Sequence, residues 1–108
     1  MDLVVAVYKA SDRLPNGEQF GLTNQIRRAA VSIPSNVAEG QGRGSTNEFQ
    51  PFLSIARGSL CEVETQIMIA QRLGYVAKDE EQELLRLADE VGRLLRGLSK
   101  SVVARNGS

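Results

Sequence analysis

Four stretches of the chain carry apolar residues at intervals of three and four, the spacing that gathers them on one face of an α-helix. The first is predicted from Asp2 to Leu14, with Leu3, Val4 and Val7 on one side, and it stops before Pro15-Asn16-Gly17. Its β-branched residues are also compatible with a strand, but no neighbouring segment offers a strand to pair with. The segment is therefore predicted to be a helix.

The second stretch begins near Gly21 or Leu22 and continues to about Gly40, and it contains a proline. Pro34 removes one backbone donor and crowds the carbonyl of Ala30, so a kink is expected rather than a break. The apolar face of this helix is predicted to be Leu22, Ile26, Ala29, Ala30, Ile33 and Val37.

The third stretch is the longest. Ser45 followed by Glu48 is the sequence of a capping box, and Gly74 supplies a stop. At about 1.5 Å per residue the helix between them would span roughly 42 Å. Its apolar face is predicted to be Phe49, Phe52, Leu53, Ala56, Leu60, Val63, Ile67, Ala70 and Leu73.

The fourth stretch runs from Lys78 or Asp79 to Leu98 or beyond, with an acidic first turn and a basic end that complement the helix dipole. A disordered tail is expected over about 104–108. The apolar face is predicted to be Leu84, Leu87, Ala88, Val91, Leu94, Leu95 and Leu98.

Four helices with short links predict an all-α, up-down antiparallel four-helix bundle in a single domain, residues 1–108. The chain has 108 residues, of which 42% are apolar, as in ordinary folded domains. The longest apolar run, Leu3 to Val7, is far too short to cross a bilayer. Neither a signal peptide nor a contact with the membrane is expected.

Charge argues against a protein whose main task is to grip phosphates, because 13 basic and 13 acidic side chains cancel. The charges are nevertheless segregated along the chain. The segment from Asp79 to Glu83 is acidic, whereas from Arg86 to Arg105 there are five basic residues and two acidic ones. A near-neutral chain also lacks the repulsion that keeps monomers apart, so self-association is compatible with this composition.

Candidate catalytic chemistry is sparse, because the chain has no histidine. This excludes the Glu-x-x-His motif of di-iron bundles and His-assisted serine or cysteine catalysis. Cys61 is predicted to be a small buried apolar residue. As the single cysteine, it permits no intrachain disulfide, which fits a reducing cytoplasm. No enzymatic activity and no cofactor are expected.

The segments LTNQIRRAAVSIPSNVAEGQGRGS (residues 22–45), Glu48-Phe49 and IARGSLCEVETQIMIAQRLGY (residues 55–75) resemble a known family. They are similar to bacterial four-helix-bundle proteins named for the 23S rRNA intervening sequence, over Asp2 to about Ser101. The same fold resembles the accessory proteins of diversity-generating retroelements. The resemblance implies a cytoplasmic homopentamer that binds structured RNA or DNA without catalytic activity. Family members usually carry further residues before this point, so a late-assigned start or a shortened first helix is expected.

Adjacent arginines and a glycine-rich turn are the candidate binding features. Arg27 and Arg28 point about 100° apart on a helix, and each could contact phosphate or form a salt bridge. The turn from Gly40 to Gly44, which contains Arg43, could form an anion-binding nest or could simply end a helix. Both interpretations remain open for each feature.

We therefore predict a nucleic-acid-binding set of Arg27, Arg28, Arg43 and Arg57, and a second patch of Arg93, Arg96 and Lys100. With few aromatic residues available for stacking, recognition would be by shape and phosphates. The alternative is a scaffold that docks a partner enzyme without touching nucleic acid.

Other polar residues of the central helices have predicted structural roles. Glu62 and Arg57 are expected to pair across helices or across subunits. Asn36 and Glu39 are expected to do the same.

Overall fold

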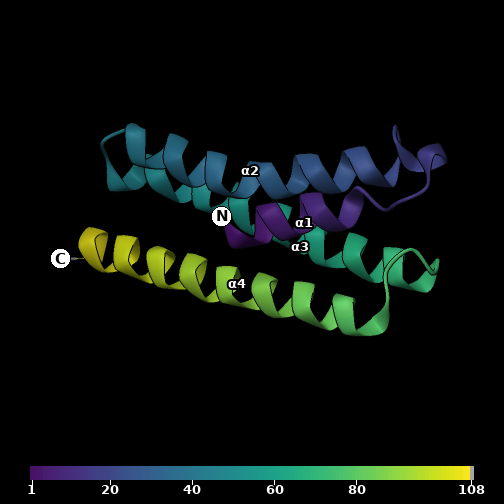
Figure 1. The fold of residues 1–108 in the computed structure, drawn as a ribbon. Helices are drawn as coiled ribbons and strands as arrows, with labels where there is room; N and C mark the ends of the chain where they lie inside the picture. The colour runs from purple at the N-terminus through teal and green to yellow at the C-terminus, as the bar shows by residue number, and fades with distance from the viewer. Residues whose placement is uncertain (108) are drawn as a thin grey trace.

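The computed structural model describes the backbone of residues 1–107 and the side chains of residues 1–102. The described chain folds into four α-helices that run alternately up and down, which confirms the predicted bundle (Figure 1). The expected tail from residue 104 falls on residues whose side chains lie outside this description, and it stays a prediction. The elements are α1 (Asp2–Ser11), η1 (Asn16–Glu18), α2 (Leu22–Gly42), α3 (Thr46–Arg72) and α4 (Lys78–Gly107).

The four helices form a closed circuit in which α1 packs on α2 and α4, and α3 packs on the same two helices from the other side. The described molecule measures 50 × 25 × 17 Å. α1 has only 10 residues, whereas α2, α3 and α4 have 21, 27 and 30. Figure 1 shows that α1 begins near the middle of the bundle, so it lies beside only part of the length of its neighbours. One end of the bundle therefore has four helices side by side and the other has three.

The core consists of the predicted apolar faces, because each helix turns its stripe inward. Val7, Leu53, Val63 and Ile67 are almost completely buried. Two predicted core leucines are exposed instead: Leu73 at 54% and Leu94 at 69%. Leu73 follows the last residue of α3, where the chain leaves the bundle. Leu94 lies on the stretch of α4 that α1 does not reach.

Three further predictions need correction. The first helix ends at Ser11 rather than Leu14, because the backbone N–H groups of Arg13 and Leu14 donate to carbonyls three residues back instead of four. Cys61 is exposed rather than buried, since it directly follows Leu60 and so lies about 100° around α3 from it. Phe52, predicted to be core, is only half-buried.

The helix ends follow the local signals. The Glu48 backbone N–H donates to the Ser45 hydroxyl (3.2 Å), which confirms the predicted N-cap of α3. Gly44 before α3 and Gly74 after it both have φ of +81°, a conformation that L-residues with side chains rarely adopt. α2 continues unbroken through Pro34.

No helix in the described part of the chain combines the length and the hydropathy that a membrane span requires.

Candidate nucleic-acid interface

Arg27 is held by its own chain. Its guanidinium donates to the Ser11 hydroxyl and to the Asp12 carboxylate, both at 2.6 Å. The same group lies over the ring of Tyr8, 4.9 Å from its centroid. These contacts tie α2 to the end of α1, so the salt-bridge interpretation accounts for this side chain.

Arg28 is exposed and has no ion pair within the described residues. It lines a polar groove of about 390 Å³ between α2 and α3, together with Ser32, Ser59, Glu62 and Gln66. The Ser32 and Ser59 hydroxyls lie 2.9 Å apart and join the two helices at the floor of this groove. The Gln66 Oε1 atom is buried there without a hydrogen-bond donor among the described residues. Arg28 is therefore available to a ligand or to another chain.

Arg43 lies at the turn between α2 and α3. Its guanidinium pairs with Glu39 (2.9 Å), one helical turn earlier, and lies 5.1 Å from the centroid of the Phe52 ring. Within the turn only Gly44 has a positive φ, while Gly40 is helical and packs closely on Phe49. The helix end accounts for Gly44, as the second interpretation of the turn proposed, whereas Gly40 is explained by a close approach of α3 that was not predicted.

Arg57 faces α4. Gln50 lies two turns earlier on the same face of α3 and exchanges hydrogen bonds of 3.4 Å with Ser99. Further along α3, the Leu60 Cδ2 atom lies 3.4 Å from the position that a Cβ would occupy at Gly92. Because α3 and α4 are antiparallel, the residues of α3 from 50 to 60 lie alongside the residues of α4 from 99 back to 92. Arg57 therefore lies at the level of Arg93 and Arg96.

The second predicted patch occupies the neighbouring surface of α4. Arg96 folds over Gly92, whose Cβ position would be 3.3 Å from its Nη1 atom, and thus leans toward α3. Arg93 is exposed and pairs with Asp89 at 2.8 Å. Lys100 is exposed and lies one helical turn beyond Arg96, with no ion pair among the described residues.

The structure thus redistributes the predicted binding residues. Arg57, assigned from the sequence to the first set, joins the second set on one surface. We call this surface the basic face and define it as Arg57, Arg93, Arg96 and Lys100. Arg27, Arg28 and Arg43 do not join it, because they lie on α2 or at its end. Two carboxylates lie nearby: Asp89, which pairs with Arg93, and Glu64, two turns after Arg57 on α3.

The acidic start of α4 lies at the opposite end of that helix. Arg13 pairs with Glu80 there, and Arg86 pairs with both Glu83 and Glu90 at 2.7 Å. Hydrogen bonds from Arg86 lower the pKa of Glu83, and the same contacts raise the pKa of Arg86. Two of the four carboxylates between Asp79 and Glu83 thus have an arginine partner, whereas three of the four cations of the basic face have no ion-pair partner among the described residues.

Glu39 and Asn36, predicted to pair across helices or across subunits, form local contacts along α2 instead. Glu39 pairs with Arg43, and the Asn36 amide donates to the carbonyl (2.8 Å) and hydroxyl (2.9 Å) of Ser32 on its own helix. Arg57 and Glu62 do not pair within the described chain, and their pairing across subunits stays a prediction.

Ser59 and Gln66 had no role in the sequence prediction, and Ser32 was expected only to help satisfy the backbone groups freed by Pro34. In the sequence all three are polar residues close to the apolar face of a helix. That Ser32 and Ser59 meet becomes evident only once α2 is packed on α3.

Comparisons with known proteins agree with this architecture. The family model described as 23S rRNA-intervening sequence protein matches residues 1–97. A solved structure from Bacteroides thetaiotaomicron VPI-5482, described as a protein with unknown function from the S23 ribosomal protein family, is similar with a TM-score of 0.83. Its sequence identity is 24%, and the match covers 92% of this chain and 93% of that one, so it supports the fold. No curated protein matches the chain.

Proposed function

This chain belongs to the family of 23S rRNA-intervening sequence proteins, and we propose that it is a non-catalytic, homo-oligomeric bundle that binds structured nucleic acid through the basic face. The observation that carries the proposal is the alignment of α3 with α4, from which we infer that Arg57 lies at the level of Arg93 and Arg96. Guanidinium groups pair well with phosphate oxygens, and three of the four cations on this face have no ion-pair partner among the described residues. The family description makes structured RNA the first ligand to test, with duplex DNA as the comparison.

Self-association explains how a chain of zero net charge could bind phosphates. Several copies on one rigid body present the basic face repeatedly, and multivalent contact gains avidity that one weak patch lacks. The pentamer implied by the family resemblance is the assembly we propose, acting in the cytoplasm. Arg28 is a second candidate contact, whereas Arg27 and Arg43 are assigned to intrachain packing.

The test is binding of a folded ribosomal RNA fragment and of duplex DNA over a salt series. We expect the affinity to fall linearly on a log-log plot, because phosphate contacts release counterions. Charge reversal at Arg57, Arg96 and Lys100, each to Glu, should weaken binding by well over about tenfold. It should also flatten the salt slope by roughly one for each phosphate that is no longer neutralised. The oligomer, measured by light scattering, should keep its mass.

The matched control reverses three exposed cations that lie outside the basic face: Lys9, Arg72 and Lys78. It changes the net charge by the same amount, so it separates local contact from general electrostatic attraction. Equal loss of binding in both triple variants would contradict the assignment of the basic face. A separate Arg28→Glu variant tests the second candidate.

A scaffold for a partner enzyme is the second candidate function. The observation that favours it is the presence of three half-exposed apolar side chains on α3, namely Ile55, Met68 and Ile69. Apolar surface of this kind fits a protein partner better than a phosphate backbone. Association with a partner that ignores salt, together with no affinity for either nucleic acid at low salt, would favour the scaffold.

A further inference from the structure

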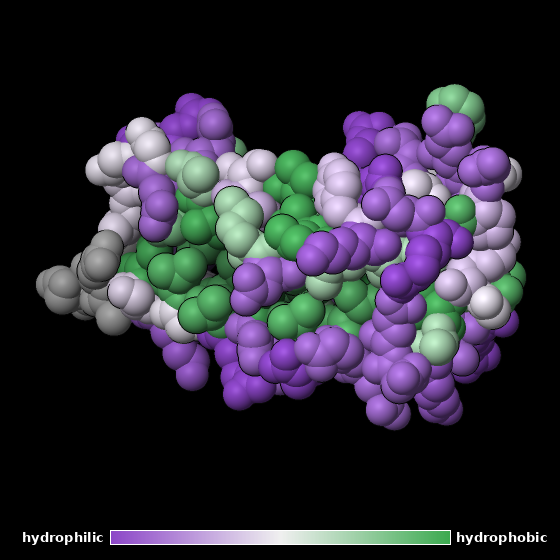
Figure 2. Space-filling view, viewed as in Figure 1, coloured by the Kyte–Doolittle hydropathy of each residue, from purple (hydrophilic) through white to green (hydrophobic). Residues whose placement is uncertain are grey.

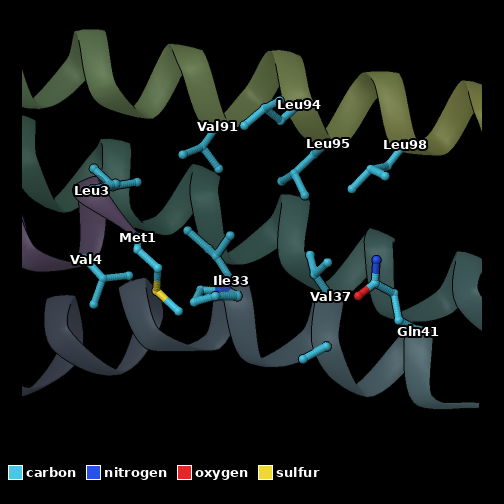
Figure 3. Close-up of a pocket in the computed structure, with 12 residues that line it drawn as sticks. Met1, Leu3, Val4, Ile33, Val37, Gln41, Val91, Leu94, Leu95 and Leu98 are labelled. Carbon is cyan, nitrogen blue, oxygen red and sulfur yellow. The ribbon is translucent and has the colours of Figure 1, made fainter.

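The two sides of α2 carry grooves of opposite character. Toward α4 the groove is apolar: Figure 2 shows apolar side chains gathered in a hollow, and Figure 3 shows those of α4 facing those of α2 across it. Toward α3 the groove is polar and contains Arg28, Glu62 and Gln66. Within the described chain α1 packs on α2 and α4 and does not contact α3. The α2–α3 side is therefore the side of the bundle away from α1.

A second stripe runs along α3 beside the stripe that faces the core. Its members recur at alternating intervals of four and three residues, so they lie within about 80° of one another around the helix. We call this stripe the outer seam and define it as Ile55, Ser59, Glu62, Gln66, Ile69 and Leu73. The isoleucines and the leucine are half-exposed. Alternating intervals of four and three are the spacing with which one helix packs on another in a coiled coil.

The centre of the outer seam holds polar groups that lack partners. Arg28 lies across the groove from Glu62, since each is one helical turn from the contact between Ser32 and Ser59 on antiparallel helices. Neither Arg28 nor Glu62 forms an ion pair with any described residue. The buried Gln66 Oε1 atom has no donor among them either. Because a buried acceptor without a donor costs free energy, a partner that brings donors to this centre is favoured.

A second outer seam supplies what the first one lacks. Two seams packed antiparallel about a two-fold axis place Ile55 beside the second copy's Leu73, Ser59 beside its Ile69, and Glu62 beside its Gln66. Apolar side chains then cover apolar ends, and the small Ser59 leaves room for Ile69. The Gln66 amide can donate to the second copy's Glu62. The second copy's Arg28, at the level of its own Glu62, comes to the level of Gln66 and can donate to the buried Oε1 atom.

We propose that the outer seam is a self-association surface on which α3 of a second copy packs antiparallel about a two-fold axis. This contact rests on the homo-oligomer proposed above and specifies a pairing that the ring does not imply. A foreign helix would need its own polar centre between apolar ends, whereas a second copy carries one by identity. Two Arg28 and two Glu62 side chains leave that centre without net charge, and the zero net charge of the chain adds no long-range repulsion.

The pairing leaves the basic face open. Arg57 lies about 160° around α3 from the middle of the outer seam, so the cations of both copies stay exposed to a ligand. An isologous contact joins copies in pairs. It yields a dimer by itself and, if the proposed ring also forms, it joins two rings. In both cases the number of copies is even, and loss of the contact halves the mass.

The first experiment compares two neighbouring substitutions by light scattering. Ile69→Lys puts a charge into both halves of the contact, so it should weaken the pairing by more than about tenfold and halve the mass of the parent. Met68→Lys is the matched control, because Met68 and Ile69 are both 44% exposed and point about 100° apart on α3. It should keep the mass of the parent. Circular dichroism should show both variants as helical as the parent.

The second experiment tests the direction of packing with single cysteines in a Cys61→Ser background. A mixture of Ile55→Cys and Leu73→Cys should cross-link with a short thiol-reactive reagent, because these positions meet in the antiparallel pair. Ile55→Cys alone should not cross-link with itself. Its two copies would lie 18 residues apart along the pair, which is roughly 27 Å.

Three results would overturn the pairing: an odd number of copies in the parent, an unchanged mass in Ile69→Lys, or cross-linking of Ile55→Cys with itself. An oligomer that keeps its mass in Ile69→Lys would remove this contact and leave the proposed homo-oligomer standing. A monomeric parent in which Ile69→Lys abolishes binding of the ribosomal RNA fragment would instead assign the outer seam to nucleic acid. Failure of the basic face is a separate outcome, since it would appear as unchanged binding after charge reversal at Arg57, Arg96 and Lys100.

Discussion

The two ends of the bundle differ in one respect, the presence of α1 between α2 and α4. At the covered end Val7 of α1 packs with Ile67 and Leu84, and the void between these helices is only about 10 Å³. At the uncovered end the same valley between α2 and α4 is an open groove of about 310 Å³. The α4 stripe shows the contrast most directly, because Leu84 is 3% exposed and Leu94 is 69% exposed.

The contrast shows that an apolar stripe predicts which face of a helix avoids water but does not predict which neighbouring element covers that face. Leu84 and Leu94 belong to one continuous pattern on one helix. Ten residues place Leu94 about 80° around α4 from Leu84, on the edge of the stripe, whereas Leu95 beside it is 2% exposed. The free energy gained by each side chain therefore depends on a neighbour that is remote in sequence.

The largest expected effect is a difference in the free energy of unfolding between a substitution at the covered end and one at the uncovered end. Ile67→Ala should lower the free energy of unfolding by about 2–5 kcal/mol, since it leaves a cavity among residues that are already close-packed. Leu94→Ala should change it by less than about 0.5 kcal/mol, because the side chain is exposed. Urea denaturation of both variants, at protein concentrations low enough to limit self-association, is the measurement. Similar losses of stability would show that the uncovered end is packed as tightly as the covered one.

A medium effect tests how tightly α2 and α3 pack at the uncovered end. At Gly40 a Cβ would lie 2.8 Å from Phe49 Cδ1 and 2.9 Å from Phe52 Cβ, so Gly40→Ala should destabilise the fold by about 1–3 kcal/mol. Gly97 of α4 is the control, since a Cβ there meets nothing within 4 Å. Gly97→Ala should raise the free energy of unfolding by about 0.5–1 kcal/mol. Thermal melts of the two variants are the measurement, and equal shifts in melting temperature would show that the close approach at Gly40 is absent.

The smallest effect concerns charge at the covered end. A hydrogen bond from Arg86 lowers the pKa of Glu83 in the folded state below its ordinary value of 4.5. The ionised carboxylate therefore stabilises the fold at a pH above 4.5, and this contribution is lost as the pH falls through the lowered pKa of the folded state. Glu83→Gln should therefore melt slightly below the parent at neutral pH. The difference should vanish well below pH 4.5. A difference that stays constant with pH would assign it to packing rather than to the ion pair.

Much of the fold was predictable from local patterns, and much of the candidate site was not. The N-cap at Ser45, the turn at Gly74 and the inward faces of α2 and α3 follow from residues within a few positions of one another. The grouping of Arg57 with Arg96 depends on how α3 and α4 are aligned, which the contacts of Gln50 and Leu60 determine. Arg27 and Arg28 show the same limit, because adjacent arginines with equal prospects in the sequence have different partners in the fold.

The sequence by itself determined four helices, their capping signals and the apolar face of each, because spacing and capping act over one or two turns of a helix. Only the tertiary structure decided that Leu94 stays exposed, that Cys61 faces solvent and which arginines remain unpaired among the described residues. These outcomes depend on the length of α1 relative to its neighbours and on the alignment of antiparallel helices. Both depend on contacts between residues far apart in the chain, so the apolar periodicity within one helix cannot predict them.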